Sequence, residues 1–350
     1  MNRPTSPLRR RGAVRLLLAS ATALALVTGC GSSGGDDQAD GAEGSAAAGG
    51  QGFPVKLTSA WGPDEVKERP VRVATVSDGD TSIALALGLV PVITPDVEDG
   101  DPVGEYKQRA LDKLGVDKLE TYDDSDGTDY EAVAAADPDI ILGMNTWDMD
   151  ADHAKLKPIA PVVTFSDKKH ADTLTWQERL TTAAKALGLT GEAEKVIAAN
   201  RAAIKDAAKT HSVLKGKTYT YAVVHPEQLT FMSYAEQDPG VFEELGLRKT
   251  DKAKNYTATK NGVSLENIDQ LEADILLVTY PFGDEGLLSA SELENNKLFK
   301  SLDAVRGGNF TVIPSDNLLS SSIAYPDALS ASWVVEELAP LLAKAAEGKK

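Results

Sequence analysis

Two segments of the chain, 131–142 and 266–277, align with each other without a gap. Both begin with Glu and end in an apolar run, and Glu, Asp, Ile and Leu coincide at matched places. Upstream of each segment lies the same tripeptide, Leu-Gly-Leu, at 87–89 and 245–247. Internal similarity of this kind is typical of repeated architecture. It predicts two similar lobes, each running as strand, helix, Leu-Gly, and then a Glu-led helix into a buried strand.

Short apolar runs separated by segments of helical period indicate an α/β fold. The expected strands are 71–76, 91–94, 140–144, 162–165, 219–224, 275–279 and 310–313. The longest helical stretch lies between the two halves. It begins with a capping box formed by Thr175 and Glu178 and is interrupted at Gly188. An amphipathic run over 192–209 follows. We therefore expect one long helical region to link the lobes.

The first 29 residues hold five arginines and no acid, and they include an apolar run from Leu16 to Val27. This order is typical of a secretory signal peptide. The run has about a dozen residues, fewer than the ~20 that a membrane-spanning helix needs. It ends in Val27-Thr28-Gly29-Cys30, which resembles the bacterial lipobox, so we expect acylation of Cys30 after removal of 1–29. A plain secretory peptide that happens to contain a cysteine is the alternative.

The region after Cys30 differs sharply in composition from the rest. Residues 30–52 consist mostly of Gly, Ser, Ala and acids, which predicts a flexible tether. Without the five signal arginines, 31 basic residues face 53 acidic ones, a formal charge of −22. So large a negative charge argues against a nucleic-acid partner. We divide the remainder into an N-terminal lobe (53–171), an interlobe helix region (172–211) and a C-terminal lobe (212–350).

Metal and catalytic motifs are weak in this chain. Cys30 is the only cysteine and the four histidines lack ligand spacing, so we predict no metal site. Ser212-Val-Leu-Lys215 matches the Ser-x-x-Lys form of penicillin-binding proteins, but it lies at a helix-to-strand junction and no Lys-Thr-Gly follows. A nucleophile elbow and a phosphate-binding glycine loop are absent from the sequence. We predict that the chain is not an enzyme.

The ordered motifs from Phe53 to the C-terminus resemble the class III substrate-binding proteins of ABC importers, which serve siderophores, haem and cobalamin. The resemblance rests on the series rather than on any one piece. Its pieces are Arg72-Val-Ala-Thr-Val-Ser77, Ala84-Leu-Ala-Leu-Gly-Leu-Val-Pro-Val92, 131–142, Leu156-Lys-Pro-Ile-Ala-Pro-Val162, Trp176-Gln-Glu-Arg-Leu180 with Ala186-Leu-Gly188, Val263-Ser-Leu-Glu266 and Asp303-Ala-Val-Arg306. It implies an α/β protein of two Rossmann-like lobes, joined by a single long helix, with the ligand cleft between them.

The resemblance also implies a docking role for two acids. In this family one glutamate at the top of each lobe pairs with arginines of the permease, and the matching positions here are Glu131 and Glu266. The alternative is that each is an ordinary acid at a helix N-terminus, where the macrodipole favours negative charge.

Ligands of α/β lobes bind beyond the carboxyl ends of the strands, so the loops there are the expected site. The candidate contacts are Tyr122, Met144, Trp147, Phe231, Tyr234, Tyr256, Tyr280, Phe282 and Tyr325. For any one of them, packing against its own lobe is the alternative. Loop segments 77–80 and 144–147, which follow two of these strands, contain no arginine or lysine, whereas tri-anionic catecholates and ferric citrate call for several cations. Lys252, Lys254 and Lys260, which flank Tyr256, count against this reading.

These observations favour a neutral or cationic ligand, such as a hydroxamate siderophore of the ferrioxamine type. The iron would arrive within the ligand, so we expect no cofactor. We therefore predict an extracytoplasmic, monomeric lipoprotein, anchored in the cell membrane, that delivers an iron(III)-siderophore to an ABC permease. Haem or cobalamin binding on the same fold and a non-transport surface lipoprotein remain alternatives.

Overall fold

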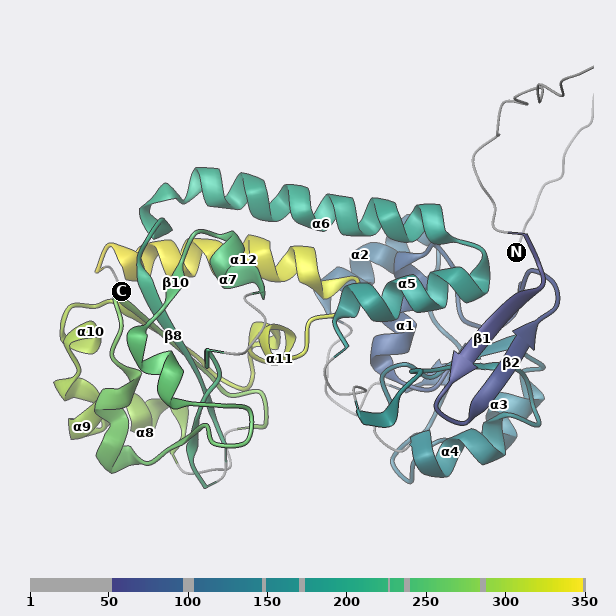
Figure 1. The fold of residues 1–350 in the computed structure, drawn as a ribbon, viewed down its shortest axis with the longest axis horizontal. Coiled ribbons are helices and arrows are strands. Elements are labelled where there is room, and N and C mark those ends of the chain that lie inside the picture. Colours follow the sequence, from purple (N-terminus) through teal and green to yellow (C-terminus); the bar gives the residue numbers. More distant parts are fainter. Residues whose placement is uncertain are drawn as a thin grey trace, which may run out of the picture. The chain divides into compact units, whose positions relative to one another are not determined.

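The computed structural model describes residues 52–96, 104–146, 149–169, 174–225, 227–235, 240–283 and 288–348. All of these fall in one compact unit. Within it, an N-lobe (52–189) and a C-lobe (211–348) are joined by helix α6 (Thr190–Thr210), which runs across the top of Figure 1. The expected signal peptide, Cys30 and nearly all of the tether lie outside the described residues.

The N-lobe is built on short parallel strands. Strand β6 pairs in parallel with β3 on one side and with β7 on the other. A bridge from Ala74 to Ile93 brings the parallel pair β4–β5 beside β3, and an antiparallel hairpin, β1–β2, precedes them. The strands are β1 (Val55–Ser59), β2 (Gly62–Val66), β3 (Val73–Thr75), β4 (Thr94–Pro95), β5 (Thr121–Tyr122), β6 (Ile140–Leu142) and β7 (Val162–Val163).

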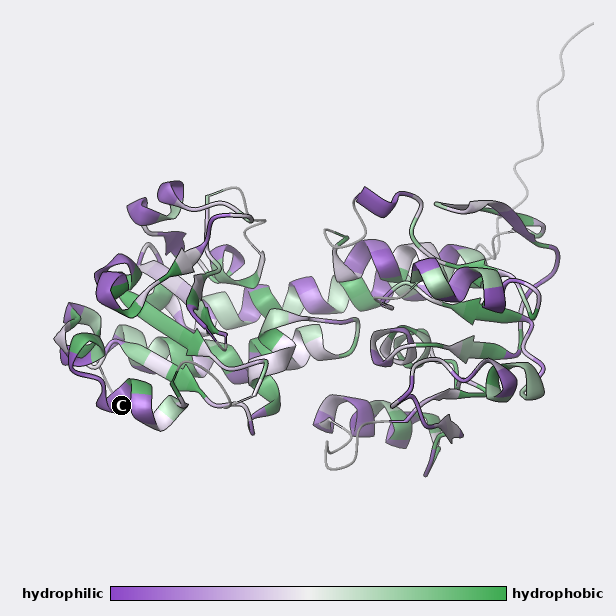
Figure 2. Ribbon diagram, turned by 90° about the horizontal axis from the view of Figure 1, so that it is seen from below, coloured by the Kyte–Doolittle hydropathy of each residue, from purple (hydrophilic) through white to green (hydrophobic). Residues whose placement is uncertain are grey.

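The C-lobe repeats this plan. Strand β12 pairs in parallel with β8 and β13, and β10 joins β8 in parallel. Two antiparallel strands, β9 and β11, extend the sheet beyond β8. The strands are β8 (Thr218–Val224), β9 (Leu229–Phe231), β10 (Arg248–Lys249), β11 (Gly262–Val263), β12 (Ile275–Thr279) and β13 (Phe310–Ile313). In both lobes the central strands are hydrophobic (Figure 2), as expected for parallel strands buried on both faces.

Helices cover the sheets of both lobes. The N-lobe has α1 (Asp78–Ala86), α2 (Glu105–Leu114), α3 (Tyr130–Ala135), α4 (Met149–Leu156) and α5 (Trp176–Leu187). The C-lobe has α7 (Gly240–Glu244), α8 (Ala290–Asn295), α9 (Lys297–Ser301), α10 (Asp303–Arg306), α11 (Leu318–Ala324) and α12 (Ser330–Ala346). Three 3₁₀ turns complete it: η2 (Ser212–Leu214), η3 (Asp251–Asn255) and η4 (Leu265–Leu271).

The internal repeat of the sequence corresponds to matched elements of the two lobes. Segment 131–142 runs through α3 into β6, and segment 266–277 runs through η4 into β12, each the central strand of its parallel set. The repeated Leu-Gly-Leu follows α1 in one lobe and α7 in the other. Gly88 and Gly246 there have φ of +79° and +95°, a conformation that L side chains rarely adopt. The predicted α/β fold, and all seven predicted strands as elements or parts of elements, are confirmed.

Helix α6 contacts the hydrophobic cores of both lobes along one apolar face. Val196 and Ile197 in its first half pack against the N-lobe core, whereas Ile204 and Ala207 in its second half pack against the C-lobe core. Helix α5 before it has the predicted Thr175–Glu178 capping box and ends at Gly188 with φ +67°. Because α5 packs within the N-lobe core, α6 is the part of the helical region that spans the two lobes.

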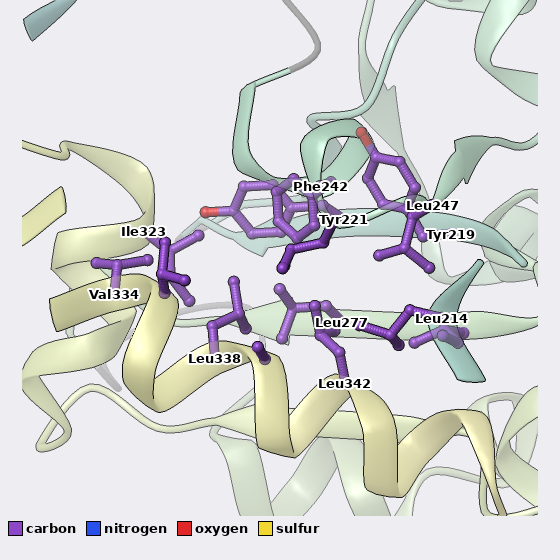
Figure 3. Close-up of a cluster of buried hydrophobic side chains, with 14 of the residues drawn as sticks. Leu214, Tyr219, Tyr221, Phe242, Leu247, Leu277, Ile323, Val334, Leu338 and Leu342 are labelled. Atoms are coloured by element: carbon purple, nitrogen blue, oxygen red, sulfur yellow. The ribbon is translucent and has the colours of Figure 1, made fainter. Parts of the chain in front are cut away.

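Helix α12 forms a second connection between the lobes. Asp327 accepts hydrogen bonds from the backbone N–H groups of Leu329 and Ser330, both at 2.7 Å, and so fixes the start of the helix. Its other side chains enter the C-lobe core, where Leu338 and Leu342 face Leu277, Tyr221 and Phe242 (Figure 3). Near its start, the Trp333 ring lies 5.4 Å from that of Tyr106 on α2, and Glu336 pairs with Arg109 of α2 at 3.1 Å. Helices α6 and α12 thus each contact both lobes.

Candidate ligand-binding site

A cavity of about 1690 Å³ opens between the two lobes. Its N-lobe wall is formed by the segments that follow β3, β4, β5 and β6, and its C-lobe wall by those that follow β12 and β13. Asn200, Arg201 and Ile204 of α6 also line it. The carboxyl ends of the parallel strands in both lobes therefore point to one space, where α/β lobes bind ligands.

Aromatic side chains form a rim on the C-lobe side of the cavity. Phe282 and Tyr325 are 46% and 53% exposed, with ring centroids 6.3 Å apart in an edge-on arrangement. His225 lies against Phe282 with a centroid distance of 4.6 Å, and burial lowers the pKa of this histidine. A smaller recess of about 310 Å³ lies beneath the rim, lined by all three residues. Exposed aromatic faces that cluster at a cavity are a typical ligand-binding feature.

The N-lobe wall contains a hydrogen-bonded chain of three polar residues. Asp80 on α1 is fully buried, and its Oδ1 accepts the backbone N–H of Met144 and the side-chain amide of Asn145, each at 2.9 Å. The Asn145 carbonyl oxygen in turn accepts a hydrogen bond from a terminal guanidinium nitrogen of Arg179. Burial raises the pKa of Asp80, while hydrogen bonds from Ser77, Met144 and Asn145 act in the opposite direction. Asn145 and Arg179 line the cavity.

Among the described residues, four basic residues line the cavity, although loop segments 77–80 and 144–147 contain none. They lie on helices instead: Lys107 on α2, Lys155 on α4, Arg179 on α5 and Arg201 on α6. Lys107 is only 6% exposed and pairs with Asp78. The expectation that the cavity itself lacks cations was therefore wrong, because its basic residues lie on helices. Lys107 lies on the buried face of α2 together with Leu111, and a lysine on that face was the signal available in the sequence.

Acidic residues outnumber basic ones in the wall of the cavity. In the part of the chain that the structure describes, eight carboxylates line it against the four cations, and they lie in both lobes. They are Asp78, Asp96, Asp124, Asp126, Asp152, Glu178, Glu244 and Asp327. The electrostatic character of the cavity wall is thus negative by residue count, which disfavours a ligand with several negative charges.

The nine predicted contacts fall into three groups. Tyr122, Phe282 and Tyr325 line the cavity. Met144, Phe231 and Tyr280 are buried in the lobe cores, Tyr256 stacks on Phe231 with centroids 4.4 Å apart, and Tyr234 is half-buried away from the lining. Trp147 lies outside the described residues. The structure therefore brings three of the nine together and places five elsewhere.

The two candidate docking glutamates lie at matched positions in the lobes. Glu131 is exposed in the first turn of α3, whose N-cap Asp129 accepts the N–H groups of Glu131 and Ala132. Glu266 is exposed at the start of η4, a 3₁₀ turn where an α-helix was expected. Both side chains point from surface turns into solvent and are accessible to a partner.

Within the described ranges, groups of three or more His, Cys, Asp or Glu that could hold a metal ion do not occur. Over the same ranges, none of the helices combines the length and the apolar character needed to cross a bilayer.

Known proteins share this fold and part of its sequence. A family model described as periplasmic binding protein matches residues 73–317. The probable siderophore-binding lipoprotein YfiY of Bacillus subtilis (strain 168) is 27% identical over 262 residues, which are 70% of this chain and 75% of the relative. The crystal structure of PiaA from Streptococcus pneumoniae TIGR4 in complex with ferrichrome has a TM-score of 0.68 at 26% identity, covering 84% of this chain and 99% of that one.

A more distant structure agrees in fold. FhuD2 from Staphylococcus aureus with bound ferrioxamine B has a TM-score of 0.59 at 18% identity, over 79% of this chain and all of that one. The family model, by contrast, covers more than two thirds of the chain. The chain belongs to the periplasmic binding protein family.

Proposed function

We propose that this protein captures a ferric siderophore in the cavity between its lobes and delivers it to an ABC permease. The observation that carries the proposal is the joint cavity, with its aromatic rim of Phe282 and Tyr325 facing a polar wall that contains Asn145 and Arg179. A ferric siderophore presents an organic outer surface and a ring of oxygen atoms around the iron. Aromatic faces suit the first, and N–H donors suit the second. The YfiY and PiaA relatives support the same ligand class.

Within that class we favour hydroxamate siderophores. Their ferric complexes are neutral or cationic, whereas a ferric tris-catecholate carries three negative charges. Eight carboxylates against four cations in the cavity wall would repel the latter more strongly.

We further propose that the protein works from a lipid anchor. The sequence around Cys30 matches a lipobox, and the YfiY relative carries the name lipoprotein. Glu131 and Glu266 would then meet basic residues of the permease. Both are exposed, and each is the first residue of its repeated segment. In this arrangement ligand binding and docking use different parts of each lobe.

A panel of ligands tests the proposal. The mature protein, residues 30–350 with Cys30 replaced by Ser, is titrated by calorimetry with ferric ferrioxamine B, a ferric tris-catecholate, ferric citrate, haem and cobalamin. We expect the hydroxamate to bind at least tenfold more tightly than the catecholate, a difference of about 1.4 kcal/mol. Tighter binding of the catecholate would overturn the hydroxamate preference. Binding of haem or cobalamin alone, or of none of the five, would overturn the siderophore function.

A further inference from the structure

The recess beneath the aromatic rim continues the main cavity toward the edge of the C-lobe sheet. It has a volume of about 310 Å³, and part of its described lining is shared with the cavity: Met232, Pro281, Phe282, Ala324 and Tyr325. The rest of that lining belongs to the recess alone: Val223, His225, Gln228, Thr230 and Asn261. The rings of Phe282 and Tyr325 therefore lie at the boundary between the two spaces.

The floor of the recess is one face of the sheet at strands β8, β9 and β11. Val223 of β8 pairs directly with Thr230 of β9, which in turn pairs with Gly262 of β11. Side chains alternate between the faces of a strand. The alternate positions pack in a hydrophobic cluster on the opposite face: Ala222, Val224, Leu229, Phe231 and Val263. Val223 and Thr230 thus face the recess, and the glycine beside them leaves space.

Two side-chain amides line the recess and make no hydrogen bond with the described part of the chain. They belong to Gln228, just before β9, and Asn261, just before β11. A Cβ added at Gly262 would overlap the terminal amide of Gln228, so this amide lies over the glycine. Both amides can therefore bind a polar group of a ligand without giving up an internal hydrogen bond.

The described lining of the recess holds no charged side chain, unlike the acid-rich wall of the main cavity. Burial lowers the pKa of His225 below its usual value of 6.5, so its ring is neutral at pH 7. Apolar walls with a few uncharged polar groups suit an uncharged organic group that carries an amide. At about 30 Å³ for each water molecule, the recess holds about ten water-sized groups, enough for a short aliphatic arm.

We propose that the recess is a second subsite, which takes the uncharged arm of a linear ferric chelate while its iron centre lies in the main cavity. This inference rests on the proposed siderophore function. A chelate held against Phe282 and Tyr325 has its appendages at the mouth of the recess, because both rings line both spaces. An ammonium group on the arm favours the acid-lined cavity instead. The recess thereby selects among chelates whose iron centres are alike.

Three ferric tris-hydroxamates with similar iron centres test this subsite. Ferrioxamine E is cyclic and has no arm, ferrioxamine B has an arm that ends in an ammonium group, and N-acetylferrioxamine B ends the same arm in an uncharged amide. Calorimetry measures the affinity of the mature protein for each. Asn261→Phe, which fills the recess, should weaken binding of the N-acetylated chelate about 10-fold, and Gln228→Ala about 3-fold. Both variants should bind ferrioxamine E within a factor of about 2 of the wild type.

Asn255→Phe and Gln108→Ala are the matched controls, because both side chains are exposed and line neither space. These controls should bind all three chelates as the wild type does. Gly262→Ala displaces the Gln228 amide without changing a lining residue, so it should reproduce the loss of Gln228→Ala. Ferrioxamine B should lose less affinity than its N-acetylated form in every recess variant. Equal losses for the cyclic and N-acetylated chelates, or no loss for either, would overturn the subsite.

A second measurement needs no siderophore. N-pentylacetamide reproduces the arm alone, and NMR of the methionine methyl groups reports where it binds. Met232 lines the recess, whereas Met144 and Met149 are buried in the N-lobe. Millimolar probe should shift the Met232 signal of the wild type, leave the other two in place, and shift none of them in Asn261→Phe.

A Met232 signal that stays in place in the wild type would overturn the subsite. If the wild type binds none of the ferric chelates, the proposed function fails, and the subsite is decided by the NMR result.

Discussion

Asp274 accepts a hydrogen bond from the backbone N–H of Thr218 at 2.8 Å, at the point where strand β8 begins beside β12. The N-lobe contains the same relationship. There Asp139 accepts the N–H groups of Val71 and Arg72, both at 2.9 Å, just before β3 begins beside β6. The two aspartates are matched positions of the internal repeat. Their shared role explains why an acid precedes the central strand in both lobes: it fixes the start of the neighbouring strand.

The first prediction concerns the stability that Asp274 contributes. The backbone N–H of Thr218 is the largest cause that lowers the pKa of Asp274 below its usual value of 3.8. A lowered pKa in the folded state means that the stabilisation is complete above pH 3.8 and is lost as the pH falls through the folded-state pKa. Asp274→Asn should therefore lower the free energy of unfolding at pH 7 by about 0.5–1 kcal/mol, a value reduced because the carboxylate is solvent-exposed and screened.

Urea unfolding at a series of pH values measures this effect. The difference in the free energy of unfolding between the wild type and Asp274→Asn should become smaller as the pH is lowered below 3.8. Asp117→Asn, at an exposed acid in the loop after α2, serves as the control and should show little change at either pH. A gap that stays constant down to pH 3 would show that the charge of Asp274 is not what matters.

The fold was largely predictable from the sequence, whereas the site was predictable only in part. Buried parallel strands appear as continuous apolar runs, and the Glu-led repeat places one in each lobe. Membership in a family of binding proteins also confirms the prediction that the chain is not an enzyme. The hairpin β1–β2 was not predicted. In β1 the buried residues Val55, Leu57 and Ser59 alternate with exposed ones, but this pattern is only five residues long and therefore gives a weak signal.

The direction of side chains in the loops limited how well the sequence predicted which residues line the cavity. Tyr280 is 1% exposed and Phe282, two residues later, is 46% exposed. A strand that continued would place both on one face, but the chain turns at Pro281 and the alternation ends there. The sequence marks where a strand ends but not how the following loop turns. Arg179 was missed for a different reason: the capping box at Thr175 locates the start of α5, but only the tertiary fold places that first turn at the cavity.

The second prediction concerns the aromatic rim. Phe282→Ala and Tyr325→Ala should each weaken binding of ferric ferrioxamine B about 5- to 15-fold, since an exposed ring that becomes covered by ligand contributes about 1–1.5 kcal/mol. Tyr234→Ala is the matched control, because Tyr234 is a half-buried C-lobe aromatic that does not line the cavity. Calorimetry provides the affinities. An equal loss in the Tyr234 variant would indicate a general effect on the lobe rather than a ligand contact.

The third prediction concerns the negative charge of the cavity wall. Asp124 and Asp126 follow β5, are exposed and line the cavity. Replacing both by Asn should raise the affinity for a tri-anionic ferric catecholate several-fold and leave that for a neutral ferric hydroxamate within a factor of about 2. The gain should shrink at 1 M salt, where the Debye length falls to about 3 Å. Equal gains for both ligands would show that charge does not select between them.

The fourth prediction concerns the anchor. Cys30 closes the sequence Val27-Thr28-Gly29-Cys30 after an apolar run, so Cys30→Ser should abolish acylation. Buried acyl chains provide the membrane affinity of a lipid anchor, so the variant without them should be largely released from the membrane. Metabolic labelling with a fatty-acid probe, followed by fractionation, measures both effects. Label that persists on the Ser variant would contradict the lipoprotein assignment.

The fifth prediction concerns delivery to the permease. Glu131 and Glu266 are exposed, occupy matched places in the repeat, and do not line the cavity. The double change Glu131→Ala with Glu266→Ala should therefore abolish siderophore uptake in cells, while the affinity of the purified protein stays within a factor of ~3, about 0.7 kcal/mol. Charged groups at an interface steer the encounter and fix its register, and truncating one partner of a buried pair costs about 2–5 kcal/mol.

The control for this test has to match the charge that is lost, because the whole chain is strongly acidic. Glu194 on α6 and Glu294 on α8 are exposed acids outside the cavity lining, so Glu194→Ala with Glu294→Ala removes two charges and leaves both repeat positions intact. Uptake should be normal in this control. A charge-reversed pair, Glu131→Lys with Glu266→Lys, should block uptake at least as strongly as the alanine pair, since like charges would then face each other. Unchanged uptake in the alanine pair, or an equal loss in the control, would remove the docking role from Glu131 and Glu266.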